Sequence, residues 1–309
     1  MLAPKFWYPE NNEKSFSSLA LVPLGHISSL LSKVRMSKAV KKQFDIPIVC
    51  IGNLNAGGTG KTPTTISAAE FLKDRKYNVH IVSRGYGGTA MGPLSVNDKE
   101  HSADEVGDEA LMLSAFAPTW VATKRSDGIQ SAIKEGADII LLDDGFQDPS
   151  VYKDLSILTV NAKKGFGNNR CIPAGPLREK LSSGLERADV LISIGTETSQ
   201  ITFKSIYKNY INMPLGIANL EVLNTGLSLE NMKVLAFAGI AHPENFFDTL
   251  RAQGAEIVDY QALADHQKLS SKIMKRLIVS ARAENAQLIT TEKDLSLINI
   301  SEPTRPFHI

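Results

Sequence analysis

The stretch Ile46–Thr62, IPIVCIGNLNAGGTGKT, decides the fold of this chain. It begins with an apolar run typical of a buried strand, and the glycine-rich run Asn55–Thr62 follows. Thr62–Leu72 then has the residue pattern of a helix. A glycine-rich turn between a strand and a helix is typical of a phosphate-binding loop, because its backbone N–H groups close around phosphate oxygens at the positive end of the helix. The sequence therefore predicts a site for a nucleoside triphosphate.

Each position of this loop has an expected part in binding ATP and Mg²⁺. The glycines let the backbone approach the phosphates, Lys61 reaches the outer phosphates, and Thr62 can ligate magnesium. Asn55 stands where the general motif has glycine. We expect the ATP site to consist of Asn55, Ala56, Gly57, Gly58, Thr59, Gly60, Lys61 and Thr62.

Short apolar runs alternate with helical patterns from residue 46 onward, for example the helical stretches Thr62–Leu72 and Glu105–Phe116. This alternation predicts an α/β fold of the P-loop NTPase type, a parallel sheet with helices on both faces. Right-handed crossovers would place the carboxyl ends of the strands, and the ligands, along one edge. The predicted strands are Ile46–Gly52, Asn78–Ser83, Thr119–Ala122, Asp138–Leu142, Leu155–Val160 and Val190–Ile194.

A second α/β alternation follows in the last third of the chain. It runs from the apolar run Lys233–Ala238 through a predicted helix at Asn245–Gln253 to Gln287–Thr290, and the mixed stretch Ile211–Asn231 precedes it. We therefore expect a domain junction in that mixed stretch. The predicted parts are an N-terminal amphipathic membrane-associated segment (1–45), a P-loop core (46–222) and a smaller C-terminal α/β lobe (223–309).

The N-terminal segment has the pattern of an amphipathic helix. Ser15–Ser32 contains no Asp, Glu, Lys or Arg, and Pro23 with several serines argues against a membrane span. An apolar face beside a basic cluster suits a helix lying at a membrane surface, whereas a helix packed on its own domain is the alternative. The apolar positions are Phe16, Ala20, Leu24, Ile27, Leu31 and Val34, and the basic ones are Lys33, Arg35, Lys38, Lys41 and Lys42.

Composition limits the remaining possibilities. The chain of 309 residues has a net charge of +1, which excludes a surface that binds nucleic acid through overall positive charge. Cys50 and Cys171 lie far apart, without a second Cys or a His at metal-ligand spacing, so no disulfide framework is expected. The N-terminus lacks the pattern of a secretory signal, and we expect a cytosolic location.

Several acidic residues and one histidine are candidates for phosphoryl chemistry. The apolar run from Asp138 ends in Asp143 and Asp144, which suits carboxylates that hold magnesium at the end of a strand. Asp108 opens a predicted helix and His266 lies in a predicted loop of the second domain. Either could assist proton transfer, although a helix-start carboxylate and a surface histidine are the ordinary alternatives.

Together these motifs resemble the tetraacyldisaccharide 4'-kinase family, the lipid A kinases of Gram-negative bacteria. The similarity follows the order of the family's motifs over nearly the whole chain. The matching stretches are Gly52–Pro63, Ser83–Gly88, Val106–Glu109, Asp143–Gln147, Pro173–Glu179, Ala238–Ile240, Asp265–His266 and Thr291–Asp294.

The resemblance implies that ATP phosphorylates the 4'-hydroxyl of a tetraacylated glucosamine disaccharide 1-phosphate at the cytoplasmic face of the inner membrane. It implies that Lys61 and Thr62 hold ATP and magnesium, and that Asp143 or Asp144 places the metal. Asp108 would be the base, and His266 its partner from the other lobe. The acceptor side would comprise Arg125, Gln147, Arg178 and Glu179. The acceptor also carries an anionic phosphate, which suits the basic residues Lys163, Lys164, Arg170 and Arg178 of the loop 163–180, although a solvated basic turn is the ordinary alternative.

Two other classes of protein share such a loop. Partition-type and metallochaperone-type switch ATPases carry an extra lysine just before the Gly-Gly pair, where this chain has Ala56. A non-catalytic nucleotide-binding membrane module would explain the loop and the N-terminal segment but would leave Asp108 and His266 without a role.

Overall fold

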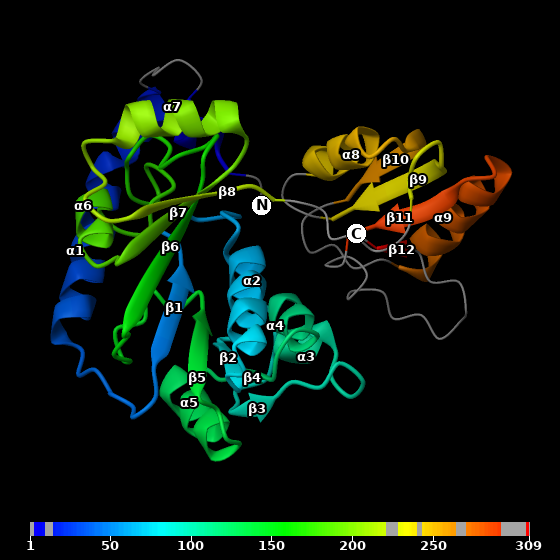
Figure 1. Cartoon of the computed structure of the whole chain (residues 1–309). Coiled ribbons are helices and arrows are strands. Elements are labelled where there is room, and N and C mark those ends of the chain that lie inside the picture. The colour runs from blue at the N-terminus through cyan, green and yellow to red at the C-terminus, as the bar shows by residue number, and fades with distance from the viewer. Residues whose placement is uncertain are drawn as a thin grey trace.

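A computed structural model describes residues 3–9, 15–220, 228–239, 243–263, 270–291 and 307–308. The described residues form two sheets, one of eight strands and one of four, each with its own helices (Figure 1). This is the predicted α/β fold, a large, mainly parallel sheet followed by a smaller α/β lobe. We refer to the two parts as the large lobe and the small lobe.

The large lobe contains the phosphate-loop strand at the centre of its sheet. Its strands are β1 Ile48–Gly52, β2 Val79–Ser83, β3 Leu94–Ser95, β4 Thr119–Val121, β5 Ile139–Asp143, β6 Leu155–Asn161, β7 Val190–Ile194 and β8 Leu215–Ala218. They lie in the order β3-β4-β2-β5-β1-β6-β7-β8. All neighbours pair in parallel except β3, an edge strand antiparallel to β4. The carboxyl ends of β1 and β5 therefore meet at one edge of the sheet.

Helices cover both faces of this sheet. Because side chains alternate along a strand, Ile139 and Leu141 of β5 pack with one set of helices while Ile140 and Leu142 pack with the other. The first set is α2 and α4, and the second includes α5, α6 and α7. The helices of this lobe are η1 Lys5–Trp7, α1 Phe16–Lys38, α2 Lys61–Asp74, α3 Ala103–Val106, α4 Asp108–Ser114, α5 Arg125–Lys134, α6 Leu181–Leu185 and α7 Glu197–Tyr207.

The small lobe repeats this layered arrangement on a smaller scale. Its strands β9 Lys233–Ala238, β10 Glu256–Ala262, β11 Gln287–Thr290 and β12 Phe307–His308 lie in the order β10-β9-β11-β12 and are all parallel. Helix α8 Pro243–Ala252 packs on one face through Phe246, Phe247 and Leu250. Helix α9 Ser271–Ala283 packs on the other through Met274 and Leu277.

The structure corrects the predicted elements in three places. The helix predicted over Glu105–Phe116 is broken into α3 and α4 at Gly107. The φ of Gly107 is 87°, which is incompatible with a right-handed α-helix. The mixed stretch Ile211–Asn231 contains β8 within its described residues. The edge strand β3 has no counterpart among the predicted strands and runs antiparallel to its neighbour.

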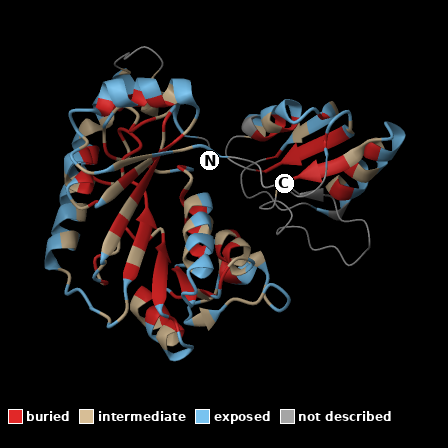
Figure 2. Ribbon diagram, viewed as in Figure 1, coloured by how far each residue is buried: buried red, intermediate tan, exposed pale blue. Residues whose placement is uncertain are grey.

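Helix α1 contacts the rest of the large lobe through small residues. The Ser18 hydroxyl donates to the carbonyl oxygen of Ala174 at 2.7 Å. A Cβ at Gly25 would lie 2.8 Å from the carbonyl oxygen of Cys171. The opposite side of α1 is exposed (Figure 2), and several of its exposed side chains are large and apolar. In the described part of the chain, no helix combines the length and apolarity that crossing a membrane requires. The exposed apolar stripe of α1 consists of Phe16, Leu19, Leu24, Ile27, Leu30, Leu31 and Val34.

Substituting Gly52, at the end of β1, tests how closely β1 packs against the turn that follows β5. A Cβ there would lie 2.5 Å from the Cβ of Phe146, in the turn that follows β5. We expect Gly52→Ala to lower the free energy of unfolding by about 1–3 kcal/mol through overpacking. Urea denaturation measures this. Gly216→Ala in β8 is the control, because its Cβ would meet Ile192 at an ordinary 3.5 Å; equal effects of the two substitutions would refute the packing argument.

Candidate active site

The phosphate loop connects β1 to α2 at the carboxyl edge of the large sheet. Gly60 requires its positive φ of 86°, and a Cβ there would also lie 2.4 Å from Ile194 Cδ1. A Cβ at Gly57 or Gly58 would meet nothing within 4 Å, so these residues border open space that phosphate oxygens can enter. Lys61 begins α2 immediately after this open turn. The geometry is that of a phosphate cradle.

Asn55 ties the phosphate loop to a segment far along the chain. It is only 2% exposed, and its Nδ2 donates to the carbonyl oxygen of Gly165 at 2.9 Å. On either side of it, Ala56 N donates to Pro176 O at 2.7 Å and Arg178 N donates to Leu54 O at 2.8 Å. Asparagine at this position therefore has a structural role, because a glycine would have no side chain to reach Gly165.

Asp143 is the last residue of β5 and is almost completely buried. Its Oδ1 accepts a hydrogen bond from Thr65 Oγ1 of α2 at 3.3 Å, while its Oδ2 has no hydrogen-bond partner in the structure. Burial raises the pKa of Asp143 to about 7, and the negative charge of Glu109 adds to this effect while Lys61 opposes it. The carboxyl group therefore lies where a cation would stabilise its charged form.

Asp144 follows in a left-handed backbone conformation, with a φ of 48°. Its carboxylate accepts hydrogen bonds from Arg178 NH1 at 3.1 and 3.2 Å, and its Oδ1 lies 3.9 Å from Lys61 Nζ. The backbone is held on both sides, because Asp144 N donates to Ile51 O at 3.0 Å and its carbonyl oxygen accepts from Arg125 NH2 at 2.8 Å. A conformation that non-glycine residues seldom adopt is thus maintained by its surroundings.

Arg125 lies behind Asp144. It begins α5, is 7% exposed, and its NH1 forms an ion pair with Asp148 Oδ2 at 3.0 Å. Asp148 is fixed in turn by the backbone N–H and the hydroxyl of Ser150. Sequence reasoning missed Asp148, although it follows the Asp143–Gln147 motif directly. The structure thus gives Arg125 two contacts within the protein, both of which support the turn after β5.

Gln147 and Glu179 meet on the other side of this turn. Gln147 Nε2 donates to Asn53 O at 2.8 Å and to Glu179 Oε1 at 3.3 Å, and Gln147 Oε1 accepts from Arg178 NH1 at 3.3 Å. Arg187 NH2 binds both oxygens of Glu179 at 2.6 and 2.5 Å, and its guanidinium lies over the Phe146 ring. No motif marks Arg187 in the sequence, so only the fold reveals this contact.

Asp108 lies at the start of α4 and is 6% exposed. A Cβ at Gly107 would lie 2.6 Å from Tyr86 O, so the loop after β2 packs against the backbone that positions Asp108. Helix α4 contacts α2, which begins at the phosphate loop, and the negative charge of Glu109 near the start of α4 raises the pKa of Asp143. The structure thus assembles the predicted residues of the large lobe around one edge, whereas His266 lies outside the described residues.

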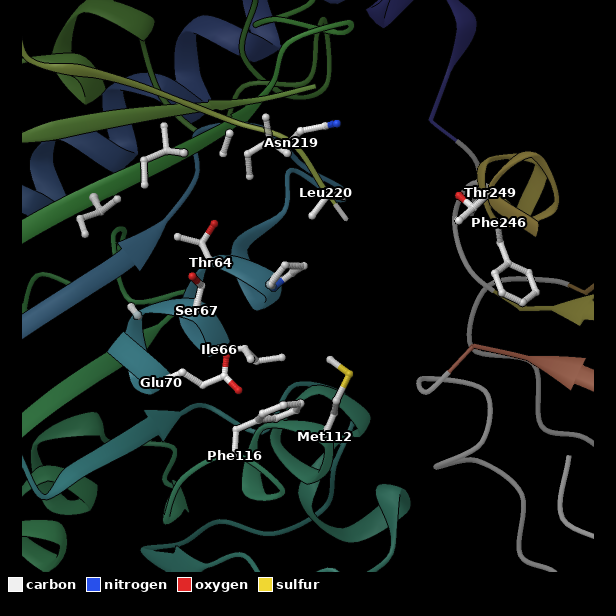
Figure 3. A pocket seen from close by; sticks show the side chains of 16 residues that line it. Thr64, Ile66, Ser67, Glu70, Met112, Phe116, Asn219, Leu220, Phe246 and Thr249 are labelled. Carbon is white, nitrogen blue, oxygen red and sulfur yellow. The ribbon is translucent and has the colours of Figure 1, made fainter. Parts of the chain in front are cut away.

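An apolar pocket of about 660 Å³ begins at the first turn of α2 (Figure 3). Thr64 and Ser67 line it on α2, and Met112 lines it on α4. Phe246 and Thr249 of α8 lie on the opposite side, so the two lobes face each other across it. Since Thr64 follows the phosphate loop closely, this pocket lies next to the phosphate cradle.

The fold and the site together define a P-loop phosphotransferase. A phosphate cradle leads into a helix with a lysine at its start, and two carboxylates lie at the end of the neighbouring strand β5. The chain belongs to the tetraacyldisaccharide-1-P 4'-kinase family, whose sequence profile matches residues 17–306. Membership of a kinase family argues against the switch-ATPase alternative.

Relatives that bear the family's name share this similarity over most of their length. The tetraacyldisaccharide 4'-kinase of Jannaschia sp. is 49% identical over 294 residues, covering 95% of this chain and 89% of the relative. That of Dinoroseobacter shibae is 46% identical, with coverage of 95% and 88%. The crystal structure of LpxK from Aquifex aeolicus in complex with ATP has the same fold, with a TM-score of 0.69 at 24% identity over 93% of this chain and 92% of that one.

The role of Asn55 can be measured by nucleotide binding. We expect Asn55→Ala to weaken the affinity for a fluorescent ATP analogue by about fivefold, because the loss of one buried hydrogen bond costs about 1 kcal/mol and loosens the loop. Asn97→Ala serves as the control, since it removes a side-chain hydrogen bond from a surface turn. An unchanged dissociation constant for Asn55→Ala would show that the contact with Gly165 does not shape the nucleotide site.

Proposed function

We propose that this protein transfers the γ-phosphate of ATP to the 4'-hydroxyl of a tetraacylated glucosamine disaccharide 1-phosphate, giving the 1,4'-bisphosphate. The observation that carries this proposal is the meeting of Lys61, Asp144 and Arg178 at the phosphate loop, in a chain whose relatives bear the name of that kinase. Lys61 would bind the outer phosphates of ATP, and Arg178 would lie between the phosphates and the acceptor.

The reaction requires a base that removes the proton of the acceptor hydroxyl. A sugar hydroxyl is a poor nucleophile near neutral pH, so a base must remove its proton as the oxygen attacks the γ-phosphorus and ADP leaves. Asp108 is proposed as this base because it is buried at the start of α4, next to Glu109, whose negative charge acts on Asp143. His266 from the small lobe is its proposed partner.

The residues near the cradle also fit a magnesium ion. Asp143 Oδ2 is a buried oxygen without a hydrogen-bond partner, and Thr62 follows Lys61 on the first turn of α2. Thr62 and Asp143, with Asp144 as a further candidate, would hold the ion through oxygen atoms, as magnesium prefers. When bound, magnesium would neutralise charge on the transferring phosphate.

The four residues predicted for the acceptor side take different parts in this proposal. Arg178 and Gln147 reach the surface of the site, with Arg178 30% exposed along its side chain. Arg125 and Glu179 are buried and paired with Asp148 and Arg187. We therefore assign Arg125 and Glu179 to holding the turn after β5 and Gln147 in place, and Arg178 to contact with the substrates.

Helix α1 would bring this site to the membrane that holds the acceptor's acyl chains. Its exposed apolar stripe would enter the interfacial region, while Arg35 and Lys38 in its last turn would meet anionic headgroups. The contact of Ser18 with Ala174 fixes the helix to the segment that supports the phosphate loop. We propose peripheral attachment to the cytoplasmic face of the inner membrane.

Labelled ATP tests the reaction and the base together. The unmodified protein should transfer label to the disaccharide 1-phosphate lipid, and Asp108→Ala should reduce this transfer by at least about 100-fold while ATP binding stays intact, as expected for loss of a general base. Asp98→Ala, which removes an exposed carboxylate, is the control. If the folded, unmodified protein transfers no label to the lipid, the proposed function is refuted. Normal turnover by Asp108→Ala would remove that residue from the mechanism.

Vesicle binding tests the apolar stripe. Introducing Leu24→Glu, Ile27→Glu and Leu31→Glu together should reduce co-sedimentation with anionic vesicles by at least about tenfold, because each leucine-sized side chain withdrawn from the interface costs about 1 kcal/mol or more. The control is Ile201→Glu with Ile206→Glu, which places the same change on the exposed face of α7. Undiminished sedimentation of the α1 variant would contradict attachment through this stripe.

A further inference from the structure

The tip of the phosphate loop, Gly57–Thr59, is held from inside the protein by a buried network of polar side chains. Gly58 borders open space, whereas Thr59 is only 5% exposed, so the Thr59 side chain turns inward. Its partners are Asn53, the first residue after β1, and Thr159 of β6. Neither partner is among the residues that the sequence predicted for the ATP site.

Asn53 is fully buried and directs its amide nitrogen at the loop tip. Its Nδ2 donates to Thr59 Oγ1 at 2.8 Å and to the carbonyl oxygen of Gly57 at 3.2 Å. Because a carbonyl oxygen can only accept, the nitrogen of the amide must face Gly57. Asn53 Oδ1 is left buried without a hydrogen-bond partner in the described part of the chain, which costs stability. The contribution of Asn53 therefore lies in its two bonds to the loop tip.

The hydroxyl groups of Thr59 and Thr159 continue this network in one direction. Thr59 Oγ1 accepts from Asn53, and its own hydrogen is donated to Thr159 Oγ1 at 3.0 Å. Thr159 in turn donates to the carbonyl oxygen of Gly52 at 3.4 Å. Since Gly52 precedes Asn53 in the chain, the network closes on itself. Each hydroxyl donates its single hydrogen within the network, so rotation of either side chain would break a bond.

Two neighbouring strands provide the fixed base of this network. Gly52 lies opposite Leu158 in the parallel pairing of β1 with β6, which puts Thr159 beside the end of β1. In addition, Gln147 Nε2 donates to the carbonyl oxygen of Asn53 at 2.8 Å. The position of the loop tip is therefore set by β1 and β6, at the centre of the large sheet.

A glycine-rich loop needs such support because glycine has more conformational freedom than any other residue. Gly57 and Gly60 have positive φ values of 104° and 86°, so the backbone on both sides of Thr59 has no side chain to restrict it. A loop that is ordered before ATP binds loses less conformational entropy when it closes around the phosphates. Because the Thr59 hydroxyl already has its partners, the tip is left to bind phosphate through its backbone N–H groups.

We propose that Asn53 and Thr159 are positioning residues, which act through Thr59 to hold the loop tip in the conformation that binds the phosphates of ATP. The inference rests on the proposed function for the identity of the nucleotide. It adds two buried residues to those that determine the affinity of the loop.

Substitution of the buried Thr159 hydroxyl by a group of the same shape tests this role. Thr159→Val leaves the Thr59 hydroxyl without its acceptor, and Thr159→Ser restores that acceptor. The control is Thr119→Val on β4, which removes a similarly buried hydroxyl that donates to Ala117 O at 2.9 Å. Strands β2 and β5 separate β4 from β1. Displacement of a fluorescent ATP analogue measures the affinity for ATP, and thermal unfolding without nucleotide measures the stability of each variant.

We expect Thr159→Val to weaken ATP binding by about fivefold or more, since a buried hydroxyl that loses its partner destabilises the ordered loop. Thr159→Ser and Thr119→Val should bind ATP as the unmodified protein does. An unchanged affinity for Thr159→Val, or an equal loss in Thr119→Val, would overturn the proposal. If Thr159→Val does not fold, Asn53→Ala supplies the same test, because it removes both bonds from the amide to the loop tip.

Steady-state kinetics separate positioning from a loss of stability. Thr159→Val should raise KM for ATP by about fivefold or more and leave kcat and KM for the lipid acceptor unchanged, because the loop binds the phosphates in the ground state and the transition state alike. A lower kcat with both KM values unchanged would indicate a merely less stable protein and contradict the proposal. If the unmodified protein binds ATP but phosphorylates no lipid, the proposed function fails, and the ATP affinities still decide the positioning role.

Discussion

The hydrogen bonding of the phosphate loop to the segment Gly165–Arg178 is the constraint on which the site depends. Backbone bonds from Ala56 to Pro176 and from Arg178 to Leu54, together with the Asn55 side chain, hold the loop from outside the sheet. The same segment receives α1 at Ala174 and Cys171. The nucleotide loop and the helix proposed for membrane attachment therefore share one support, which fixes the catalytic edge relative to that helix.

Two ion pairs stabilise the turn that follows β5. Arg125 with Asp148 and Arg187 with Glu179 lie beneath the turn after β5, and each pair reaches the site through a residue of that turn. Breaking such a pair leaves an uncompensated buried charge, which is costly. The left-handed conformation of Asp144 is thus maintained by contacts that also orient Arg178.

Local patterns were sufficient to predict the central strands and the carboxylates that follow β5. The apolar run before Asp143 and Asp144 is continuous because that strand is buried on both faces. The half-exposed edge strand β8 has no such run and was missed. Arg187 and the tether from Asn55 to Gly165 could not be predicted, because they depend on segments that only the folded chain brings together.

The central claim is that the transferred phosphate arrives on one particular sugar oxygen. Two-dimensional proton–phosphorus NMR of the lipid recovered after incubation with ATP tests it most directly. The account expects a new phosphomonoester whose phosphorus couples to the proton on carbon 4' of the distal glucosamine. Consumption of ATP that yields only inorganic phosphate, or a phosphate attached at any other position, would contradict it.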